Sequence, residues 1–540
     1  MRWLEREMGV KKQSFMTGAF VLSAAGIITK IFGALYRIPL TWLIGDEGMG
    51  LYGMSYPLYN MLLVLSTAGI PVAISKLVSE KVTKGNYRDA QRVFGLSFLM
   101  LATSGLFFSL LLFFGARPLL NKGFLRDPRA YYGIVCIAPA VFLVSVMSAF
   151  RGFFQGLQTM VPTALSQIVE QLARAATALS LAYYLFGRGI EFAAAGAAFG
   201  AVVGALAGLL LLLVFYSRRH LYFTGPRLYR GERSTPGEIV ASIVKLAIPV
   251  SLASLVMPLV QNIDVAIVPA RLGVAGYSVK EATALFGQLS QMAATLINLP
   301  TIITVAIGVS LVPAISAASA LGDEALVRSR VAAAVRMTII VELPAFVGLY
   351  ILAEEIMALL YGHPQAGVAL SGLAASVLFL GLHQTTSGVL QGLGRTDIPV
   401  KSLLVGAVCK VILTYILTAR PAFGIRGAAL GTVTAFIISS SLNLLALGRL
   451  IGFSLEVKDM FIKPAVAAGL MGLAVVGSYR LVAPRGGNSP ATLISIGVGA
   501  VAYVLILFLL GGLGARDVEM MPWIGPRLSA RLKGRGRLKD

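Results

Sequence analysis

Long apolar runs separated by short polar or glycine- and proline-containing breaks fill most of this 540-residue chain. A helix needs about 20 apolar residues to cross the hydrocarbon core of a bilayer. The runs do not alternate between apolar and polar positions, which excludes a β-barrel. The pattern predicts about fourteen transmembrane helices, at residues 15–44, 51–78, 92–116, 131–155, 160–186, 190–216, 241–270, 283–317, 329–352, 366–392, 398–419, 424–448, 462–483 and 490–513.

The composition supports an all-α polytopic membrane protein. Apolar residues make up 57% of the chain and charged residues 13%, with a mean hydropathy of +0.82, whereas a soluble protein carries about 25% charged residues. This excludes a soluble enzyme, a disordered protein and a disulfide-stapled secreted domain. Cys136 and Cys409 lie inside apolar runs, so no structural disulfide is expected, and three scattered histidines make a metal site improbable.

The formal net charge of +22 is distributed unevenly along the chain. When basic residues near span ends are counted with the adjacent loop, 31 of the 46 fall on one side of the predicted membrane, 11 on the other and four inside spans. The positive-inside rule then places both termini in the cytoplasm. The basic loop 117–129 (Arg117, Lys122, Arg126, Arg129) is an exception, and either a misplaced boundary or an outward contact with lipid headgroups explains it.

Two basic segments stand outside the spans. The loop 217–240 carries Arg218, Arg219, Arg227, Arg230 and Arg233, and the tail 514–540 carries Arg527, Arg531, Lys533, Arg535, Arg537 and Lys539. Such segments bind anionic lipid at the cytoplasmic surface. Nucleic acid is not an expected partner, because no folded soluble module accompanies them.

Three sequence matches recur in order at nearly one offset. PVAIS at 71–75 resembles VPAIS at 312–316, FQGL at 154–157 resembles LQGL at 390–393, and GIEFAAAG at 189–196 resembles GIRGAALG at 424–431. The offset equals six spans, so the match predicts two parallel six-helix repeats and two additional C-terminal helices. The predicted segments are 1–216 (first lobe), 217–240 (cytoplasmic linker), 241–452 (second lobe), 453–513 (helices 13 and 14) and 514–540 (basic tail).

Ionisable side chains inside a membrane are costly and usually face a cavity or a partner. Seven stand out: Lys30, Arg37, Glu170, Arg174, Asp264, Glu342 and Lys410. In the first span, Gly26, Lys30, Gly33 and Arg37 are spaced 4, 3 and 4 residues apart, which puts two cations on one helical face. They either line a cavity or extend to opposite membrane surfaces.

In the fifth span, Glu170 and Arg174 form an i, i+4 pair beside Gln167 and Gln171. The pair is either a structural intramembrane ion pair or part of a substrate or gating site. Glycines at 196, 200, 204 and 208 in the sixth span predict a ridge for close helix packing.

The second repeat presents different chemistry. Its seventh span carries Ser254, Gln261 and Asp264 on one face with Asn262 beside them, and its eighth carries Gln288, Gln291, Thr295 and Asn298. These residues either line a cavity or make interhelical hydrogen bonds. The first copy thus presents cations and the second amides and a carboxylate, which suggests a substrate with two unlike ends. Glu342 precedes Pro344 and is interpreted as a structural charge at a kink. His383 and Gln384 in the tenth span could line the cavity, but a hydrogen-bonded histidine is favoured.

No nucleotide-binding motif, metal-ligand cluster or nucleophile–base pair is present in the sequence. An enzyme or an ATP-driven pump is therefore disfavoured, and a secondary transporter is predicted. No cofactor is expected, and a coupling Na⁺ or H⁺ is left open.

Several stretches resemble the polysaccharide-biosynthesis branch of the multidrug/oligosaccharidyl-lipid/polysaccharide (MOP) superfamily, close to its sporulation-type members. They are ITKIFGALYRIPL (28–40), GLYGMSYPLYNMLLVLSTAGIPVAISKLVSE (50–80), FQGLQTMVPTALSQIVEQLAR (154–174) and LINLPTIITVAIGVSLVPAIS (296–316). The resemblance implies a V-shaped, two-lobed fold in a bacterial cytoplasmic membrane, alternating access, and a polyprenyl-diphosphate-linked saccharide as substrate for cell-wall or spore-cortex synthesis.

The lipid II flippases of this superfamily hold the substrate diphosphate with cavity cations. Lys30 matches one such basic position, and Arg37 lies within a residue of another. Where those flippases have further cations, this chain has the neighbourhood of Asn60 and Met61 and, in the eighth span, Thr295. Half of the cluster is therefore missing, which leaves the lipid II assignment open and favours the sporulation-type branch. The alternatives are a cation antiporter of the same fold, which would use Asp264 and Glu170, and a scaffold that recruits cell-wall synthesis proteins without transport.

Overall fold

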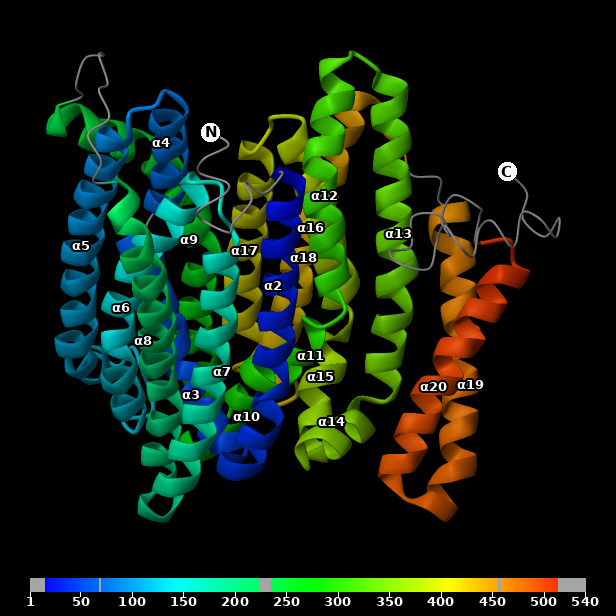
Figure 1. Ribbon diagram of the computed structural model, residues 1–540. Helices are drawn as coiled ribbons and strands as arrows, with labels where there is room; N and C mark the ends of the chain where they lie inside the picture. Colours follow the sequence, from blue (N-terminus) through cyan, green and yellow to red (C-terminus); the bar gives the residue numbers. More distant parts are fainter. Residues whose placement is uncertain (1–14, 68, 224–234, 455–457, 513–540) are drawn as a thin grey trace. The chain divides into compact units, whose positions relative to one another are not determined.

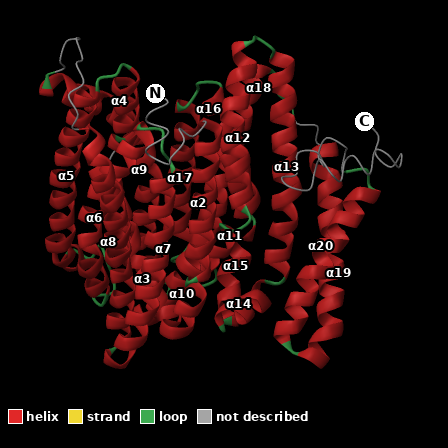
Figure 2. Ribbon diagram, viewed as in Figure 1, coloured by secondary structure: helices red, strands yellow, loops and turns green. Residues whose placement is uncertain are grey.

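The computed structural model describes residues 15–67, 69–223, 235–454 and 458–512. Every regular element within these ranges is a helix, as Figure 2 shows, which confirms the predicted all-α class. The chain divides into two compact units, residues 1–291 and 292–540. The loop residues Arg227, Arg230 and Arg233 and the tail 514–540, which the sequence assigns to the membrane surface, lie outside the described residues.

Within the described residues, the first unit has nine α-helices, which Figure 1 labels. They are α2 (Phe15–Leu35), α3 (Arg37–Thr67), α4 (Ile70–Thr83), α5 (Tyr87–Asn121), α6 (Ala130–Gly156), α7 (Val161–Leu185), α8 (Ile190–Phe223), α9 (Pro236–Val274) and α10 (Val279–Gly287). A 3₁₀ turn, η1 (Phe186–Arg188), joins α7 to α8, and a π-helical turn, η2 (Gln288–Ala293), follows α10.

The described part of the second unit continues with ten α-helices. They are α11 (Ala294–Ile297), α12 (Thr301–Ala320), α13 (Glu324–Ile351), α14 (Ala353–Tyr361), α15 (Gly367–Ala374), α16 (Ser376–Gly392), α17 (Asp397–Leu417), α18 (Ile425–Ile451), α19 (Lys463–Gly486) and α20 (Asn488–Leu509). Two short turns, η3 (Pro364–Ala366) and η4 (Lys458–Ile462), precede α15 and α19.

The predicted spans coincide with these helices, and their breaks have local causes. Gly45 is non-helical (φ 65°, ψ −175°) inside α3, where the first predicted span ends, a backbone conformation that glycine adopts readily. The eighth predicted span is interrupted by the π-helical turn η2. The tenth is bent by 43° between α15 and α16.

Fewer helices than the predicted fourteen are both long and apolar enough to cross a membrane. Within the described residues there are 11, or up to 12 if the bent pair is one span. The difference is explained by helices that are polar or short. Helix α7 carries two glutamines as well as Glu170 and Arg174. In α2, the apolar part is the shorter segment Val21–Leu35.

The repeated motifs make the same helix crossing in each unit. A Cβ atom at Gly156 in the FQGL motif of α6 would lie 2.9 Å from Ser75 O of α4, and one at Gly392 in the LQGL motif of α16 would lie 2.9 Å from Val312 O of α12. In both units a glycine of the FQGL/LQGL helix therefore packs directly on the PVAIS/VPAIS helix. This packing supports the internal duplication inferred from sequence; the segment boundaries drawn from it stay a prediction.

Aromatic packing forms the core of the first unit where α4, α5, α6, α8 and α9 meet. The rings of Phe94 and Phe153 lie 4.7 Å apart, and Tyr216 of α8 lies 5.3 Å from Phe94. In the second unit, α19 and α20 pack on each other and on α13, and the Tyr503 hydroxyl donates a hydrogen bond to Ile340 O (2.9 Å). The two additional C-terminal helices therefore form a hairpin on α13.

Candidate substrate-binding site

Three charged side chains from two helices of the first unit form an ion-pair cluster. Arg174 donates to Glu170, one turn earlier on α7 (Nη2–Oε1 2.6 Å), and Arg151 of α6 donates to the other carboxylate oxygen (Nη2–Oε2 2.8 Å). The predicted Glu170–Arg174 pair is confirmed, with an unpredicted third member. The side chains are only 12% to 16% exposed. Two cations share one carboxylate, so the cluster carries a formal excess of one positive charge.

Tyrosine hydroxyls of α3 and of the turn before it lie between this cluster and Arg37. Arg174 Nη1 donates to Tyr56 Oη (2.6 Å), and the hydroxyls of Tyr36 and Tyr52 lie 2.9 Å apart. Tyr36, Tyr52 and Tyr56 are the electrostatic neighbours of Arg37, and Tyr56 is a neighbour of both arginines. A hydroxyl both donates and accepts, so the tyrosines can hydrogen-bond an anion that the arginines attract.

The glycine ridge of α8 holds α7 in place. Cβ atoms at Gly200 and Gly204 would lie 2.7 Å from Arg174 O and 2.6 Å from Glu170 O, and one at Gly208 would lie 3.1 Å from Ser166 O. These separations are shorter than normal van der Waals contact, so only glycine fits. The predicted packing ridge is confirmed, and it lies directly behind the ion-pair cluster.

The two predicted diphosphate ligands differ in their surroundings. Helical hydrogen bonds of 3.1 Å continue on both sides of the junction at Tyr36, so Lys30 and Arg37 keep the spacing that places them on one face. Lys30 is exposed on α2, whereas Arg37 is half-buried. A Cβ at Gly33, between them in sequence, would lie 3.1 Å from Gln171 Nε2 of α7. The first span therefore packs beside the ion-pair helix.

Two of the polar residues from the seventh and eighth spans make interhelical hydrogen bonds. Gln288 Nε2 donates to Asp46 Oδ2 (2.7 Å), and Asn262 Nδ2 donates to Pro57 O (2.8 Å). Gln291 is buried, with its Nε2 atom 3.0 Å from the position of a Cβ at Gly53. Interhelical bonding, which the sequence left as an alternative to a cavity role, is present at Gln288 and Asn262.

The other predicted residues are placed as follows. Asn60 on α3 and Asp264 on α9 are half-buried, and Gln261 is exposed. In the second unit, Thr295 is buried, and Asn298 is exposed and donates to Ala294 O (2.7 Å). Their part in binding substrate stays a prediction.

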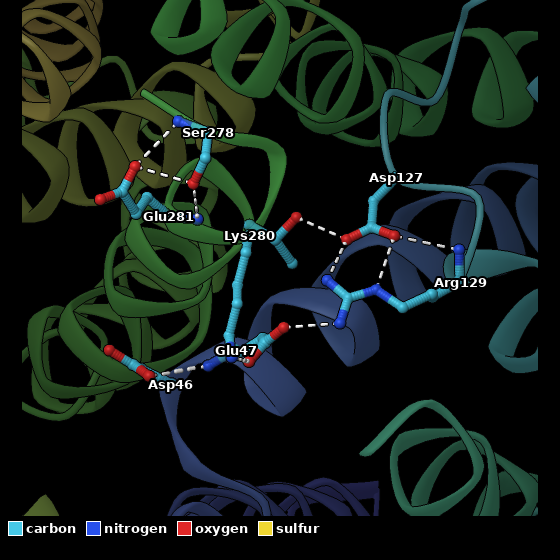
Figure 3. Close-up of polar contacts among 8 residues, drawn as sticks. Asp46, Glu47, Asp127, Arg129, Ser278, Lys280 and Glu281 are labelled. Atoms are coloured by element: carbon cyan, nitrogen blue, oxygen red, sulfur yellow. Dashed lines mark hydrogen bonds and ion pairs between the residues drawn. The ribbon is translucent and has the colours of Figure 1, made fainter. Parts of the chain in front are cut away.

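A second charged cluster, shown in Figure 3, links α3, the α5–α6 loop and α10. Arg129 binds Asp127 in a bidentate manner (Nε–Oδ1 3.0 Å, Nη2–Oδ2 2.7 Å) and donates to Glu47 Oε1 (2.6 Å). Thr283 donates to Asp127 Oδ2 (2.9 Å), and Lys280 lies 3.4 Å from Glu47 Oε2. The cluster fastens the start of the eighth predicted span to the first repeat.

The charges of this cluster stabilise one another. Burial opposes ionisation of Asp127, but hydrogen bonds from Arg129 and Thr283 outweigh it and hold the pKa of the carboxyl group below its ordinary value. The Asp127 hydrogen bond in turn raises the pKa of Arg129, against burial. The basic character of loop 117–129 is therefore partly compensated, because Arg129 is paired. In addition, α5 continues to Asn121, so the span boundary at 116 was set too early.

Sequence reasoning missed Arg151 and the Asp127–Arg129–Glu47 cluster. Arg151 lies inside an apolar run, three residues before the FQGL motif, and its position there was a usable signal. No such signal exists for the second cluster, because Glu47 is 82 residues from Arg129 along the chain.

Comparisons with known proteins agree with this architecture. The family model described as "Polysaccharide biosynthesis protein" matches residues 15–316, and the MatE model matches residues 249–416. The chain is 29% identical over 516 residues to stage V sporulation protein B of Bacillus subtilis, covering 95% of this chain and 99% of the relative. It is 27% identical to the lipid II flippase MurJ of the same organism, covering 85% and 87%.

Solved structures show the same fold. The inward closed conformation of a lipid II flippase MurJ superposes with a TM-score of 0.68 at 15% identity, covering 91% of this chain and 98% of that one. An inward-facing multidrug-resistance MATE transporter of the MOP superfamily gives a TM-score of 0.64 at 16% identity, covering 78% and 94%.

Proposed function

We propose, from the premise that this chain belongs to the polysaccharide biosynthesis protein family of the MOP superfamily, that it flips a polyprenyl-diphosphate-linked saccharide outward across a bacterial cytoplasmic membrane. The family comprises flippases of polysaccharide and lipid-linked precursors; the diphosphate-linked substrate is the proposed part. Its relatives named for spore formation and for lipid II favour a precursor of cell-wall or cortex peptidoglycan.

The observation that carries the proposal is the excess of positive charge in the first unit. One carboxylate, Glu170, accepts hydrogen bonds from both Arg151 and Arg174. Tyrosine hydroxyls neighbour Arg174 and Arg37. Arginine is well suited to phosphate because its planar donors bind two oxygens at once. Arg151 and Arg174 thus supply two cations in a chain that has Asn60 and Thr295 where the lipid II flippases have basic residues. Lys30, exposed on the same helical face as Arg37, is the proposed first contact for the diphosphate.

The mechanism follows from charge compensation. An unpaired dianion that moves outward gains about 4.6 kcal/mol per 100 mV of inside-negative potential, because each charge contributes about 2.3. Pairing with Lys30 and Arg37 cancels this term while the site is loaded. The empty cationic site is then driven back inward by the same potential, which gives alternating access a direction.

The other parts of the substrate have proposed contacts of their own. The saccharide meets the polar residues of the seventh and eighth spans, and the polyprenyl tail stays in lipid along α19 and α20. The proposal includes both termini in the cytoplasm and the basic loop and tail as segments that bind anionic lipid. Cell-wall synthesis proteins are further proposed partners.

Reconstitution in liposomes tests the proposal. We expect Lys30→Ala/Arg37→Ala to lose most flipping of a polyprenyl-diphosphate-linked saccharide. Lys401→Ala, which removes a 74% exposed lysine paired with Asp397, serves as the matched control and should retain activity. Normal activity of the double variant would refute the site. A wild-type protein that flips nothing but still recruits cell-wall synthases would support the scaffold alternative.

The cation-antiporter alternative has less support. It requires an available carboxylate in the site, and Glu170 is engaged by two arginines. Transport of a cationic drug by the wild-type protein, with loss in Asp264→Asn, would support that alternative instead.

A further inference from the structure

A buried carboxyl group in the second unit is not used by the proposed diphosphate site. Glu342 lies in the middle of α13 and is 0% exposed. Neither of its carboxyl oxygens receives a hydrogen bond of normal geometry. An ionised carboxylate in such a place costs several kcal/mol unless it is paired. The group therefore requires a bound cation or a proton.

A glycine and a hydroxyl group lie beside the Glu342 side chain. A Cβ at Gly381 of α16 would lie 2.8 Å from Glu342 Cγ and 3.1 Å from Oε1, so the glycine creates the space that the side chain occupies. The polar neighbour of the carboxyl group is Thr304 of α12. The Thr304 hydroxyl donates to Gln384 Oε1 or to Thr301 O, both at 2.9 Å.

This arrangement distinguishes the two forms of the carboxyl group. A hydroxyl has one proton to donate, and that of Thr304 is directed to other acceptors. The hydroxyl oxygen is left to accept a hydrogen bond, which a protonated Glu342 can donate and an ionised Glu342 cannot. A neutral, proton-holding Glu342 is therefore an alternative to the structural charge at the Pro344 kink that the sequence suggested.

Several titratable groups on the elements that pack against α13 make contacts elsewhere. The helices α12 and α15 contain none, and the only one on α16, His383, contacts Ser439 of α18 (2.8 Å), as the hydrogen-bonded histidine predicted from sequence. Tyr503 of α20 donates to Ile340 O. On α13 itself, Arg336 donates to Gly512 O. The remaining groups on packed elements are Glu354, Glu355 and Tyr361 of α14, Arg426 and Arg449 of α18, Lys458 and Asp459 of η4, and Lys463, Tyr479, Arg480 and Arg485 of α19.

We propose that Glu342, with Thr304 and Gly381, is a proton-binding site of the second unit, and that each transport cycle binds and releases one proton there. The coupling part rests on the proposed flippase function. A proton fits better than a metal cation, because hard cations need several oxygen ligands and no group of three or more His, Cys, Asp or Glu residues suited to a metal occurs in the described part of the chain.

Infrared difference spectroscopy on the full-length protein in liposomes, without substrate, tests the site itself. We expect wild type to show the carbonyl band of a protonated carboxylic acid that disappears as the pH is raised. Glu342→Gln should lack this band. Glu324→Gln, which changes an exposed glutamate at the start of the same helix (75% side-chain exposure), should retain it. Thr304→Val keeps the carboxyl group but removes the acceptor, so the band should move to higher frequency. This second variant gives a result even if Glu342→Gln does not fold.

Two results would overturn the proton site. One is a band unaltered by both Glu342→Gln and Thr304→Val. The other is loss of the band on adding Na⁺ at constant pH, which would identify a metal-cation site instead.

The pH profile of flipping then tests the coupling. A single titrating group changes a rate by up to about tenfold per pH unit on one side of its midpoint. We expect such a dependence in wild type and Glu324→Gln, and a nearly flat profile in Glu342→Gln. Identical profiles in all three would overturn the coupling. If wild type flips no diphosphate-linked saccharide, the proposed function fails, and the spectra still decide whether Glu342 holds a proton.

Discussion

The substitution Glu170→Gln distinguishes between two roles of the Glu170 cluster, a substrate-binding site and a purely structural ion pair. The substitution keeps the side-chain shape and removes the single negative charge shared by Arg151 and Arg174. Loss of one partner from a fully buried ion pair costs roughly 3–5 kcal/mol. Because the three side chains are 12% to 16% exposed, we expect the free energy of unfolding to fall by about 2–3 kcal/mol.

The same change should strengthen anion binding. A diphosphate held by these arginines would lie about 6 Å from the Glu170 carboxylate, and at an effective dielectric constant of about 20 each pair of like charges there costs about 2.8 kcal/mol. Screening by solvent reduces this value to about 1–2 kcal/mol, or roughly 5- to 30-fold in affinity. Turnover should fall, because a more tightly held substrate is released more slowly.

The assay compares stability, binding and transport in one set of variants. Unfolding is followed in detergent, binding with farnesyl diphosphate as a short-chain probe, and flipping in liposomes. Glu80→Gln, which breaks an exposed pair with Lys84, is the matched control and should leave all three quantities unchanged. If Glu170→Gln loses stability but binds the diphosphate no more tightly, the cluster is structural and the reasoning is refuted.

Three further predictions concern packing and the second cluster. Gly204→Leu should abolish diphosphate binding and lower the free energy of unfolding by about 3 kcal/mol or more, because a Cβ there would lie 2.6 Å from a backbone oxygen of α7. The same change at Gly95, where a Cβ meets nothing within 4 Å, should be tolerated. Equal effects of the two changes would contradict the role of the glycine ridge in holding α7. Arg129→Ala should cost about 2–3 kcal/mol in unfolding experiments, since it leaves the Asp127 side chain (1% exposed) without its cation, and Arg129→Lys should recover part of that loss. Because the pKa of Asp127 is lowered in the folded protein, its stabilising effect is present above the ordinary value of about 3.9 and is lost as the pH falls through the lowered value. We therefore expect the contribution of Asp127 to the free energy of unfolding to stay constant between pH 7 and 5 and to be lost at lower pH. Asp127→Asn should remove this loss of stability at low pH.

Helix positions were predictable because their signal is local. Apolar runs of membrane-crossing length mark α5, α6, α17 and α18 to within a few residues. Breaks were predicted in part: the break at Gly45 lies where the first predicted span ends, whereas the π-helical turn at Gln288–Ala293 lies inside the eighth predicted span. The Glu170–Arg174 pair was also predictable, since both residues lie on one turn of one helix.

By itself, the sequence determined that this is a multi-pass helical membrane protein with an internal repeat, a cationic first span and a glycine ridge on the sixth. The repeat follows from motifs that recur at nearly one offset along the chain, and the other properties depend on composition or on spacing within one helix. Only the tertiary structure decided which charges meet: Arg151 with Glu170, Arg129 with Asp127 and Glu47, and Thr304 beside a buried Glu342. The physical reason is that the stability of a charge inside a membrane protein depends on its partners and its burial, and helices far apart in the sequence supply both.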